Sequence, residues 1–379
     1  MPKNIFRRWT KYCLVISNIV VAVLFLLSCY GGYLNPVYFW FTGFLTLASF
    51  FLFAFLVLFL FFWLIVKPRR SLISFISIGL AFIPFRQVIP WRITSSFNKI
   101  KPDTVLRVMT WNVEHFDILE HKTHPEIKKQ MLDLVNDFAP DIACFQEMVG
   151  SDSVPGAINY VPDIQKALGF NDAYYSYNRK IDFDGNHHFG IIIFSRLPVI
   201  NKQTVSYPPH DYNSIFQYAD IVRNTDTFRL FNIHLQSLKF SPSNLQYIDN
   251  PEMKNEEDIR QAEKLAGKFK VGFIKRMTQS ERVAAEIRDS PYPVIVCGDF
   301  NDVPNSFTYL RIKGDRNDVF TKKGFGFGRS FAWLSPTLRI DYILANKKLE
   351  ATQFQKTVLP YSDHFPLVAD FNLPAPNGE

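Results

Sequence analysis

The first 100 residues of the chain contain no aspartate or glutamate, and they include two long uncharged apolar runs, at 12–34 and 37–66. A helix of about 20 apolar residues crosses the ~30 Å hydrocarbon core of a bilayer, so each run predicts a transmembrane helix. A third segment, 71–89, contains an apolar stretch of only 15 residues, a length that also suits an interfacial or buried helix. We therefore expect residues 1–94 to form a membrane anchor with about three transmembrane helices.

Basic residues set the expected orientation of this anchor. Arg7, Arg8 and Lys11 precede the first run, basic residues fill the 67–70 loop, and the turn at 31–36 is neutral. Because positive loops stay in the cytoplasm, a spanning third segment puts the rest of the chain outside the cytoplasmic membrane. We favour that placement, although four basic residues at 86–101 count against it and a non-spanning segment leaves the rest cytoplasmic. A cleaved signal peptide is the alternative for the first run, but its apolar region is too long.

The net charge is unevenly distributed along the chain. The first 100 residues hold ten of the 42 basic residues and none of the 35 acidic ones, so the remainder has a formal charge of −3 while the whole chain has +7. A strong non-specific DNA-binding surface needs cationic contacts along the phosphate backbone. The composition of the remainder argues against such a surface without excluding a nuclease.

Residues 95–103 are polar and include Pro102, which predicts a linker to a second domain at 104–374. Helical spacing of apolar residues is present at 125–138 and at 259–287, the latter with Gly267 and Gly272 as candidate breaks. The clearest expected strands lie at 106–111, 142–145, 190–194, 228–235, 293–297, 340–344 and 367–371. Many short strands with helices between them favour two packed sheets covered by helices. Cys144 and Cys297 lie inside apolar strands, so we expect reduced, buried thiols.

Polar residues recur where these apolar strands end. Any one of them is more often a turn residue than a functional one, but their order along the chain is informative. The motifs are Met109 to Asn112, Cys144 to Glu147, Phe231 to Leu235, Val296 to Asp302, Arg339 to Tyr342 and Tyr361 to His364. As a set they resemble the endonuclease/exonuclease/phosphatase superfamily over nearly all of residues 104–372. The resemblance implies an α+β fold, a four-layer α/β/β/α sandwich of two mixed sheets flanked by helices.

The resemblance also implies roles for the motif residues. Glu147 is the expected principal ligand of Mg²⁺, with Mn²⁺ as an alternative, and Asn112 and Asp363 lie near the metal; hard oxygen ligands suit these ions. Asp299 is expected to orient or deprotonate the attacking water, with Asn301 holding the water or the phosphate. Asp341 holds the ring of His364, and both His364 and His234 assist at the phosphate. Whether one or two metals bind stays open.

Other residues bear on the substrate. By the same resemblance Arg196 and Tyr175 are candidate phosphate-pocket residues, although 174–177 is more often sheet packing. His187 and His188 are adjacent and point to opposite faces if they lie on a strand, so we expect a solvated loop rather than a metal pair. The polar insertion at 241–257 predicts a mobile rim.

The sequence thus predicts a membrane-anchored, divalent-metal-dependent phosphoester hydrolase of the phosphodiesterase or nuclease type. Its expected partners are the bilayer, through residues 12–89, and a phosphoester substrate, either a nucleic acid or a phospholipid head group. A phospholipid head-group or sugar phosphatase of the same superfamily is the alternative. A catalytically silent membrane scaffold is a further alternative. Such a scaffold is expected to have lost Glu147, Asp299 or His364, and all three are present. No protein partner is inferred.

Overall fold

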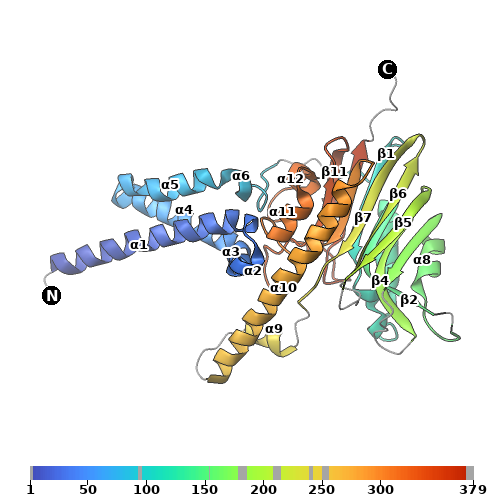
Figure 1. Cartoon of the computed structure of the whole chain (residues 1–379), viewed down its shortest axis with the longest axis horizontal. Coiled ribbons are helices and arrows are strands. Elements are labelled where there is room, and N and C mark those ends of the chain that lie inside the picture. Colours follow the sequence, from blue (N-terminus) through green and yellow to red (C-terminus); the bar gives the residue numbers. More distant parts are fainter. Residues whose placement is uncertain are drawn as a thin grey trace, which may run out of the picture.

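Two six-stranded β-sheets pack face to face, with helices on both outer sides and a helical bundle at the N-terminus (Figure 1). The computed structural model describes residues 3–92, 96–152, 154–177, 186–207, 215–238, 242–249 and 256–372. This architecture confirms the predicted α/β/β/α sandwich preceded by apolar helices.

The first sheet has the strand order β11-β12-β1-β2-β4-β3, and the second has the order β5-β6-β7-β8-β10-β9. The strands are β1 (Val105–Asn112), β2 (Ile142–Ser151), β3 (Asp172–Tyr177), β4 (His187–Ser195), β5 (Val199–Ser206), β6 (Ile215–Arg223), β7 (Asp226–His234), β8 (Val294–Asp299), β9 (Asn317–Asp318), β10 (Asp341–Ala345), β11 (Glu350–Lys356) and β12 (Leu367–Asn372). The pairs β1–β2 and β7–β8 are parallel, and the other neighbouring strands are antiparallel.

Alternating side chains divide the interior into three apolar layers. Leu106 and Val108 of β1 lie in the core between the two sheets, whereas Met109 and Trp111 face the helices on the outer side. Strand β8 divides in the same way, with Ile295 turned toward the first sheet and its neighbours toward the helices that cover the second. Alternate side chains of one strand thus contact different apolar layers, which places the two sheets in the middle of the sandwich, as the sequence predicts.

Helices α7 (Pro125–Phe138) and α8 (Tyr160–Leu168) cover the first sheet, while α10 (Glu256–Arg288) and α11 (Phe307–Lys313) cover the second (Figure 1). Helix α12 (Val319–Lys323) contacts both sheets, with Val319 in the core between them and Phe320 against Phe354 of β11. The expected break in α10 is wrong, because the helix runs unbroken through Gly267 and Gly272. At Gly272 a β-carbon would come within 2.5 Å of Leu238 Cδ2, so glycine here allows a close approach of the segment that follows β7.

The N-terminal bundle consists of α1 (Lys3–Tyr30), α2 (Pro36–Phe39), α3 (Phe41–Leu47), α4 (Ser49–Val66), α5 (Ser71–Leu80) and α6 (Phe82–Phe85). Two stretches are long and apolar enough to span a membrane, Arg7–Tyr33 and Ser49–Val66. The run at 37–66, expected as one helix, is instead divided among α2, α3 and α4. The third segment contains only the ten residues of α5 and the single turn of α6.

This bundle projects from one side of the sandwich, with the N-terminus at its far end (Figure 1). At the near end it directly contacts the loops that flank β8 and β10 of the second sheet. Asn305 donates its side-chain amide to the Pro84 carbonyl (3.0 Å), and the buried Arg339 donates to the Gln87 carbonyl (2.7 Å). Gly32 is buried against the Asn305 backbone. The bundle and the sandwich therefore share an interface and are not joined by the chain alone.

Two local expectations need correction or restriction. His187 and His188 do not form a solvated loop, because both lie on β4 and are 4% exposed. His187 Nε2 accepts from the Ile158 N–H (3.0 Å), and His188 stacks on Tyr177 and contacts Asp152, so both are structural. In the 241–257 insertion, α9 (Pro242–Asp249) and the start of α10 are described, and the rest lies outside the described residues.

Candidate active site

Strand direction brings the motif residues to one edge of the sandwich. The carboxyl ends of the parallel strands β1, β7 and β8 carry Asn112, His234 and Asp299. Strand β10 runs antiparallel to β8, so its first residue, Asp341, pairs in register with Asp299. His364 lies just before β12, which is antiparallel to β1. Residues from distant parts of the chain therefore meet where these strand ends coincide.

Asp299 is the centre of this cluster and is 1% exposed. Its carboxylate accepts from the side-chain amides of Asn112 (3.3 Å) and Asn301 (3.1 Å) and from the Asn301 backbone N–H (2.7 Å). His234 Nε2 and His364 Nε2 each lie 3.7 Å from Asp299 Oδ2. Burial, opposed by His364 and reinforced by the charge of Asp341, raises the pKa of Asp299 to about 8. These surroundings make the Asp299 carboxylate a stronger base than an exposed aspartate.

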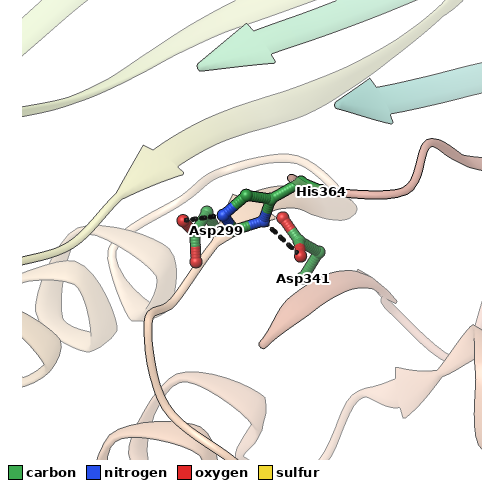
Figure 2. Close-up of side chains that lie close together, drawn as sticks. All are labelled: Asp299, Asp341 and His364. Carbon is green, nitrogen blue, oxygen red and sulfur yellow. Dashed lines mark hydrogen bonds and ion pairs between the residues drawn. The ribbon is translucent and has the colours of Figure 1, made fainter. Parts of the chain in front are cut away.

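The ring of His364 lies between two carboxylates (Figure 2). Asp341 Oδ2 is 2.9 Å from His364 Nδ1, which leaves Nε2 directed at Asp299. Burial lowers the pKa of His364, but the charges of Asp341 and Asp299 outweigh it and hold that pKa well above its usual value. Ser330 Oγ accepts from the backbone N–H groups of Ile340 and Asp341 and so fixes the start of β10. The arrangement favours a protonated imidazolium whose Nε2 faces the cluster.

Glu147 reaches the cluster through a bulge in β2. The pairing of β2 with β4 shifts between Phe145 and Met148, and Glu147 has a φ of 55°. Its carboxylate lies 3.3 Å from His115 Nε2 and 3.7 Å from His234 Nε2. A bulge re-aims one side chain without ending the strand, which is why β2 continues to Ser151, beyond the predicted 142–145.

A buried amide pair supports this bulge from inside. Gln146 Nε2 donates to Asn232 Oδ1 (2.7 Å), and Asn232 donates to the carbonyls of Phe145 (3.1 Å) and Ile192 (2.9 Å). Asn232 belongs to β7 of the second sheet, and the other three residues belong to the first. The pair therefore fixes the separation of the two sheets directly behind Glu147 and His234.

The close pairing of β7 with β8 requires glycine at position 298. Gly298 has a φ of 135°, and a β-carbon on it would lie 2.0 Å from the Ile233 carbonyl oxygen. The residue before Asp299 must therefore lack a side chain, both for its backbone conformation and for the space beside β7.

Glu114 and His115 belong to the rim of the cluster and are absent from the motifs read in the sequence. Glu114 Oε2 accepts from the Asp363 backbone N–H (2.8 Å), and Glu114 donates its own N–H to Asn112 Oδ1 (3.2 Å). Residues 114–117 all have positive φ, a tight turn that no sequence periodicity signals. The available signal was their position two and three residues after Asn112, the last residue of β1.

Negative charge is concentrated at this rim. Burial, then the charges of Asp363 and Glu147, raise the pKa of Glu114 to about 7. The pKa of Asp363 is also raised, by burial and by the Glu147 charge, against the opposing effect of His364. Carboxylates that repel one another in this way are a chemically suitable site for a hard divalent cation.

Within the described part of the chain, two sets of side chains near Asp299 have donor atoms that suit a metal. Ligand atoms of Asp299, Asp341 and His364 all lie within 4.8 Å of one another. The second set is the predicted one, the oxygen-bearing side chains of Asn112, Glu147 and Asp363, which suits Mg²⁺ better because that ion prefers oxygen ligands. The hydrogen bond between Asp341 and His364 already occupies Nδ1 of the first set.

The structure does not bring the two predicted substrate residues into this cluster. Arg196 follows the end of β4 that pairs with Ile142, at the start of β2 and away from the Glu147 bulge. Its guanidinium donates to the carbonyls of Pro140 and Leu168. Tyr175 packs over Gly150 and donates its hydroxyl to the Met148 and His188 carbonyls, so it supports the strand that carries Glu147.

Comparison with protein families agrees with the geometry. The sequence profile of the Endonuclease/Exonuclease/phosphatase family matches residues 109–364, about two thirds of the chain. The chain belongs to this family. The matched range begins with the Met109 motif and ends at His364, so it contains all the clustered residues described above. Members of the family are phosphoesterases and nucleases. A second profile, for a domain of unknown function (DUF8431), matches residues 11–88.

Solved structures also resemble the chain, and the first two below bear the name of the Endonuclease/Exonuclease/phosphatase family. A protein from Beutenbergia cavernae DSM 12333 is 15% identical with a TM-score of 0.49, over 71% of this chain and 72% of that one. A family protein from Bacteroides thetaiotaomicron is 16% identical with a TM-score of 0.49, over 73% and 100%. The human Nocturnin catalytic domain with bound sulfate is 16% identical with a TM-score of 0.48, over 72% and 96%. Comparison with curated proteins finds no match.

Proposed function

We propose that this chain is a divalent-metal-dependent phosphoester hydrolase of the phosphodiesterase type. The observation that carries the proposal is the position of Asp299, a buried carboxylate held by two asparagines and flanked by two histidines. Such a carboxylate is suited to orient a water molecule and to take its proton as the water oxygen bonds to phosphorus.

The remaining steps fall to the histidines and their partners. As the bond between phosphorus and the ester oxygen breaks, His364 Nε2 gives its proton to the departing oxygen, and Asp341 stabilises the imidazolium before that transfer. His234 contributes a ring nitrogen where negative charge grows on the phosphate. Asn301 holds the attacking water through its side chain, next to Asp299. The products are a phosphate-bearing fragment and an alcohol.

Glu147, with Asn112 and Asp363, would hold the divalent cation. When bound, a Mg²⁺ or Mn²⁺ ion at these oxygens supplies positive charge to the phosphate oxygens in the transition state. The raised pKa values of Glu114 and Asp363 support this assignment because they mark negative charge that the protein leaves uncompensated.

We further propose that α1 and α4 span a bilayer, that α5 and α6 carry the chain back across it, and that the catalytic domain lies outside the cytoplasmic membrane. Support comes from the basic residues. The N-terminus of α1 lies at the end of the bundle remote from the sandwich (Figure 1), and Arg7 and Arg8 belong to the first turns of this helix. Arg69 and Arg70 lie in the connection between α4 and α5. Positive loops stay cytoplasmic, which is consistent with a catalytic domain on the opposite side.

A substrate panel with defined metals tests the hydrolase proposal. The full-length protein in detergent is assayed with bis(p-nitrophenyl) phosphate, p-nitrophenyl phosphate and plasmid DNA, each with Mg²⁺, Mn²⁺, Ca²⁺ or EDTA. We expect hydrolysis of at least one phosphodiester with Mg²⁺ or Mn²⁺ and its loss in EDTA. Full activity in EDTA contradicts the metal assignment, and absence of hydrolysis under every condition supports a silent scaffold.

A further inference from the structure

A groove of about 340 Å³ lies between α10 and the segment that follows β7, outside the catalytic cluster. Its lining includes Gln236, Leu238, Gly267, Lys268, Val271 and Lys275. Lys268, Val271 and Lys275 are three and four residues apart on α10, so they share one face of the helix. The groove therefore has an apolar stripe, Leu238 and Val271, between Lys275 and Lys268, whose ammonium also donates to Asn244 Oδ1 of α9 (2.8 Å).

The groove is continuous with the catalytic cluster through the backbone. Gln236 is two residues beyond His234, a separation of roughly 7 Å along an extended chain. Leu235 donates its N–H to the Asp299 carbonyl (3.1 Å) and accepts at its own carbonyl from Asn301 (3.0 Å). The Gln236 backbone N–H donates to Gln279 of α10 (2.9 Å). A substrate whose phosphate lies beside His234 and Asp299 can thus extend over this fixed segment into the groove.

The same helix contacts the N-terminal bundle on its other side. Phe269 and Phe273 pack their rings against Phe44 of α3 (centroids 5.1 and 5.6 Å), and the Lys270 ammonium lies over the Trp40 ring (5.4 Å). The apolar helix α4 begins a few residues after Phe44. Helix α10 therefore meets the bundle near α2 and α3, at the end from which the two apolar helices α1 and α4 extend (Figure 1).

Exposed aromatic residues lie at that end of the bundle, a composition typical of a membrane–water boundary. Tyr33 and Tyr38 are exposed in the turn between α1 and α3, and Trp40 follows them. Tyrosine and tryptophan are enriched where membrane proteins meet the lipid head groups. The groove on α10 thus lies near the depth at which head groups are found if α1 and α4 span the bilayer.

We propose that the groove is a subsite for a phospholipid of this bilayer, one that carries a second anionic group beside the ester cleaved in the catalytic cluster. The two lysines attract the anionic group, and the stripe of Leu238 and Val271 accommodates the apolar part next to it. This inference rests on the proposed hydrolase function and names its substrate class. A nucleic acid fits less well, because the groove is apolar between its two charges and the soluble part of the chain has a formal charge of −3.

Head-group preference tests the subsite. The full-length protein is reconstituted in phosphatidylcholine vesicles and in vesicles that also contain phosphatidylserine, and release of the head group or lipid alcohol is measured with Mg²⁺. We expect a higher kcat/KM for phosphatidylserine. In the Lys268→Gln/Lys275→Gln variant the ratio of the two kcat/KM values should fall about 10- to 30-fold, since each ammonium near an anionic surface contributes roughly a factor of five. The control Lys129→Gln, exposed on α7, should keep the ratio.

The possible outcomes separate the subsite from the hydrolase function. Hydrolysis of bis(p-nitrophenyl) phosphate without hydrolysis of any lipid, preference for plasmid DNA, or an unchanged ratio in the double variant overturns the subsite alone. Should no phosphoester be hydrolysed, the proposed function fails, and binding decides the subsite. Titration of dihexanoyl-phosphatidylserine into the full-length protein in neutral detergent should then show binding that the double variant weakens at least about tenfold. Equal affinity in both proteins contradicts it.

Discussion

Replacing Gly32 with alanine tests whether the N-terminal bundle is a structural part of the catalytic site. A β-carbon at Gly32 would lie 2.0 Å from the Asn305 carbonyl oxygen and 2.9 Å from the Ser306 carbonyl carbon. Both contacts are to backbone, so no side chain can move aside. Asn305 belongs to the loop that begins at Asn301, directly after Asp299. The added methyl must therefore displace the bundle, the catalytic loop or both.

Overpacking of this kind costs about 1 to 3 kcal/mol. At roughly 2 to 4 °C per kcal/mol, we expect Tm of the full-length protein in detergent to fall by about 2 to 12 °C. Turnover of a phosphodiester should fall at temperatures where the protein remains folded, because the loop carries Asn301. The assay is thermal unfolding together with kcat and KM at one temperature.

Gly79 provides a matched control for this substitution. It is an exposed glycine in α5 of the same bundle, and a β-carbon there meets nothing within 4 Å. Gly79→Ala should keep Tm and kcat or raise Tm slightly, since alanine favours helix over glycine. If Gly32→Ala matches Gly79→Ala in both measurements, the bundle does not support the catalytic loop and the reasoning is refuted.

Two further substitutions separate catalysis from folding. Asp341→Asn removes the charge that holds the His364 ring, so kcat should fall about 10²- to 10⁴-fold with little change in Tm. A kcat within threefold of that of the original chain would exclude His364 as a general acid held by Asp341. Arg107→Ala removes a buried guanidinium that donates to Asp370 twice (2.7 and 2.8 Å) between β1 and β12, away from the cluster. It should cost about 3 to 5 kcal/mol in denaturant unfolding, and a loss below about 1 kcal/mol would contradict the pairing.

The strand pattern was readable from the sequence where strands are buried. Alternation at 106–111 and 367–371 predicted β1 and β12 because both lie in the interior of the first sheet. Strands β5 and β11 have mostly polar, partly exposed residues and lie at sheet edges, so periodicity gives little signal for them. In β6, the buried Gln217 and Asp220 interrupt the apolar pattern, and only tertiary partners such as Ser176 and Arg229 explain their burial.

The cluster itself followed from motif order, since strand ends are where functional groups of this sandwich collect. The sequence did not predict the local backbone conformation at two places in the cluster. The bulge at Glu147 and the left-handed turn that brings in Glu114 and His115 depend on pairing with β4 and on contact with Asp363. Arg196 shows the opposite error: a basic residue in a turn fits a phosphate pocket by type, but strand direction places it at the other end of β4.

The bundle shows how tertiary contact changes an apolar run. Residues 37–66 satisfy the length and hydropathy of one spanning helix, yet the helical pattern is interrupted at Trp40 and Ala48, on either side of α3, which packs against α10. The helix that remains, α4, has 18 residues. The contacts of Phe44 with Phe269 and Phe273, 225 or more residues away in sequence, could not be read from the run itself.

Turnover of the Asp299→Asn variant tests the central claim most directly. The full-length protein and this variant are compared on bis(p-nitrophenyl) phosphate with Mg²⁺ and with EDTA, and Asp137→Asn, an exposed carboxylate on α7, serves as control. The account predicts metal-dependent hydrolysis by the original chain and by Asp137→Asn, and a loss of at least about 10²-fold in kcat for Asp299→Asn with an unchanged Tm. Hydrolysis by Asp299→Asn at the rate of the control would show that the clustered residues do not carry the reaction.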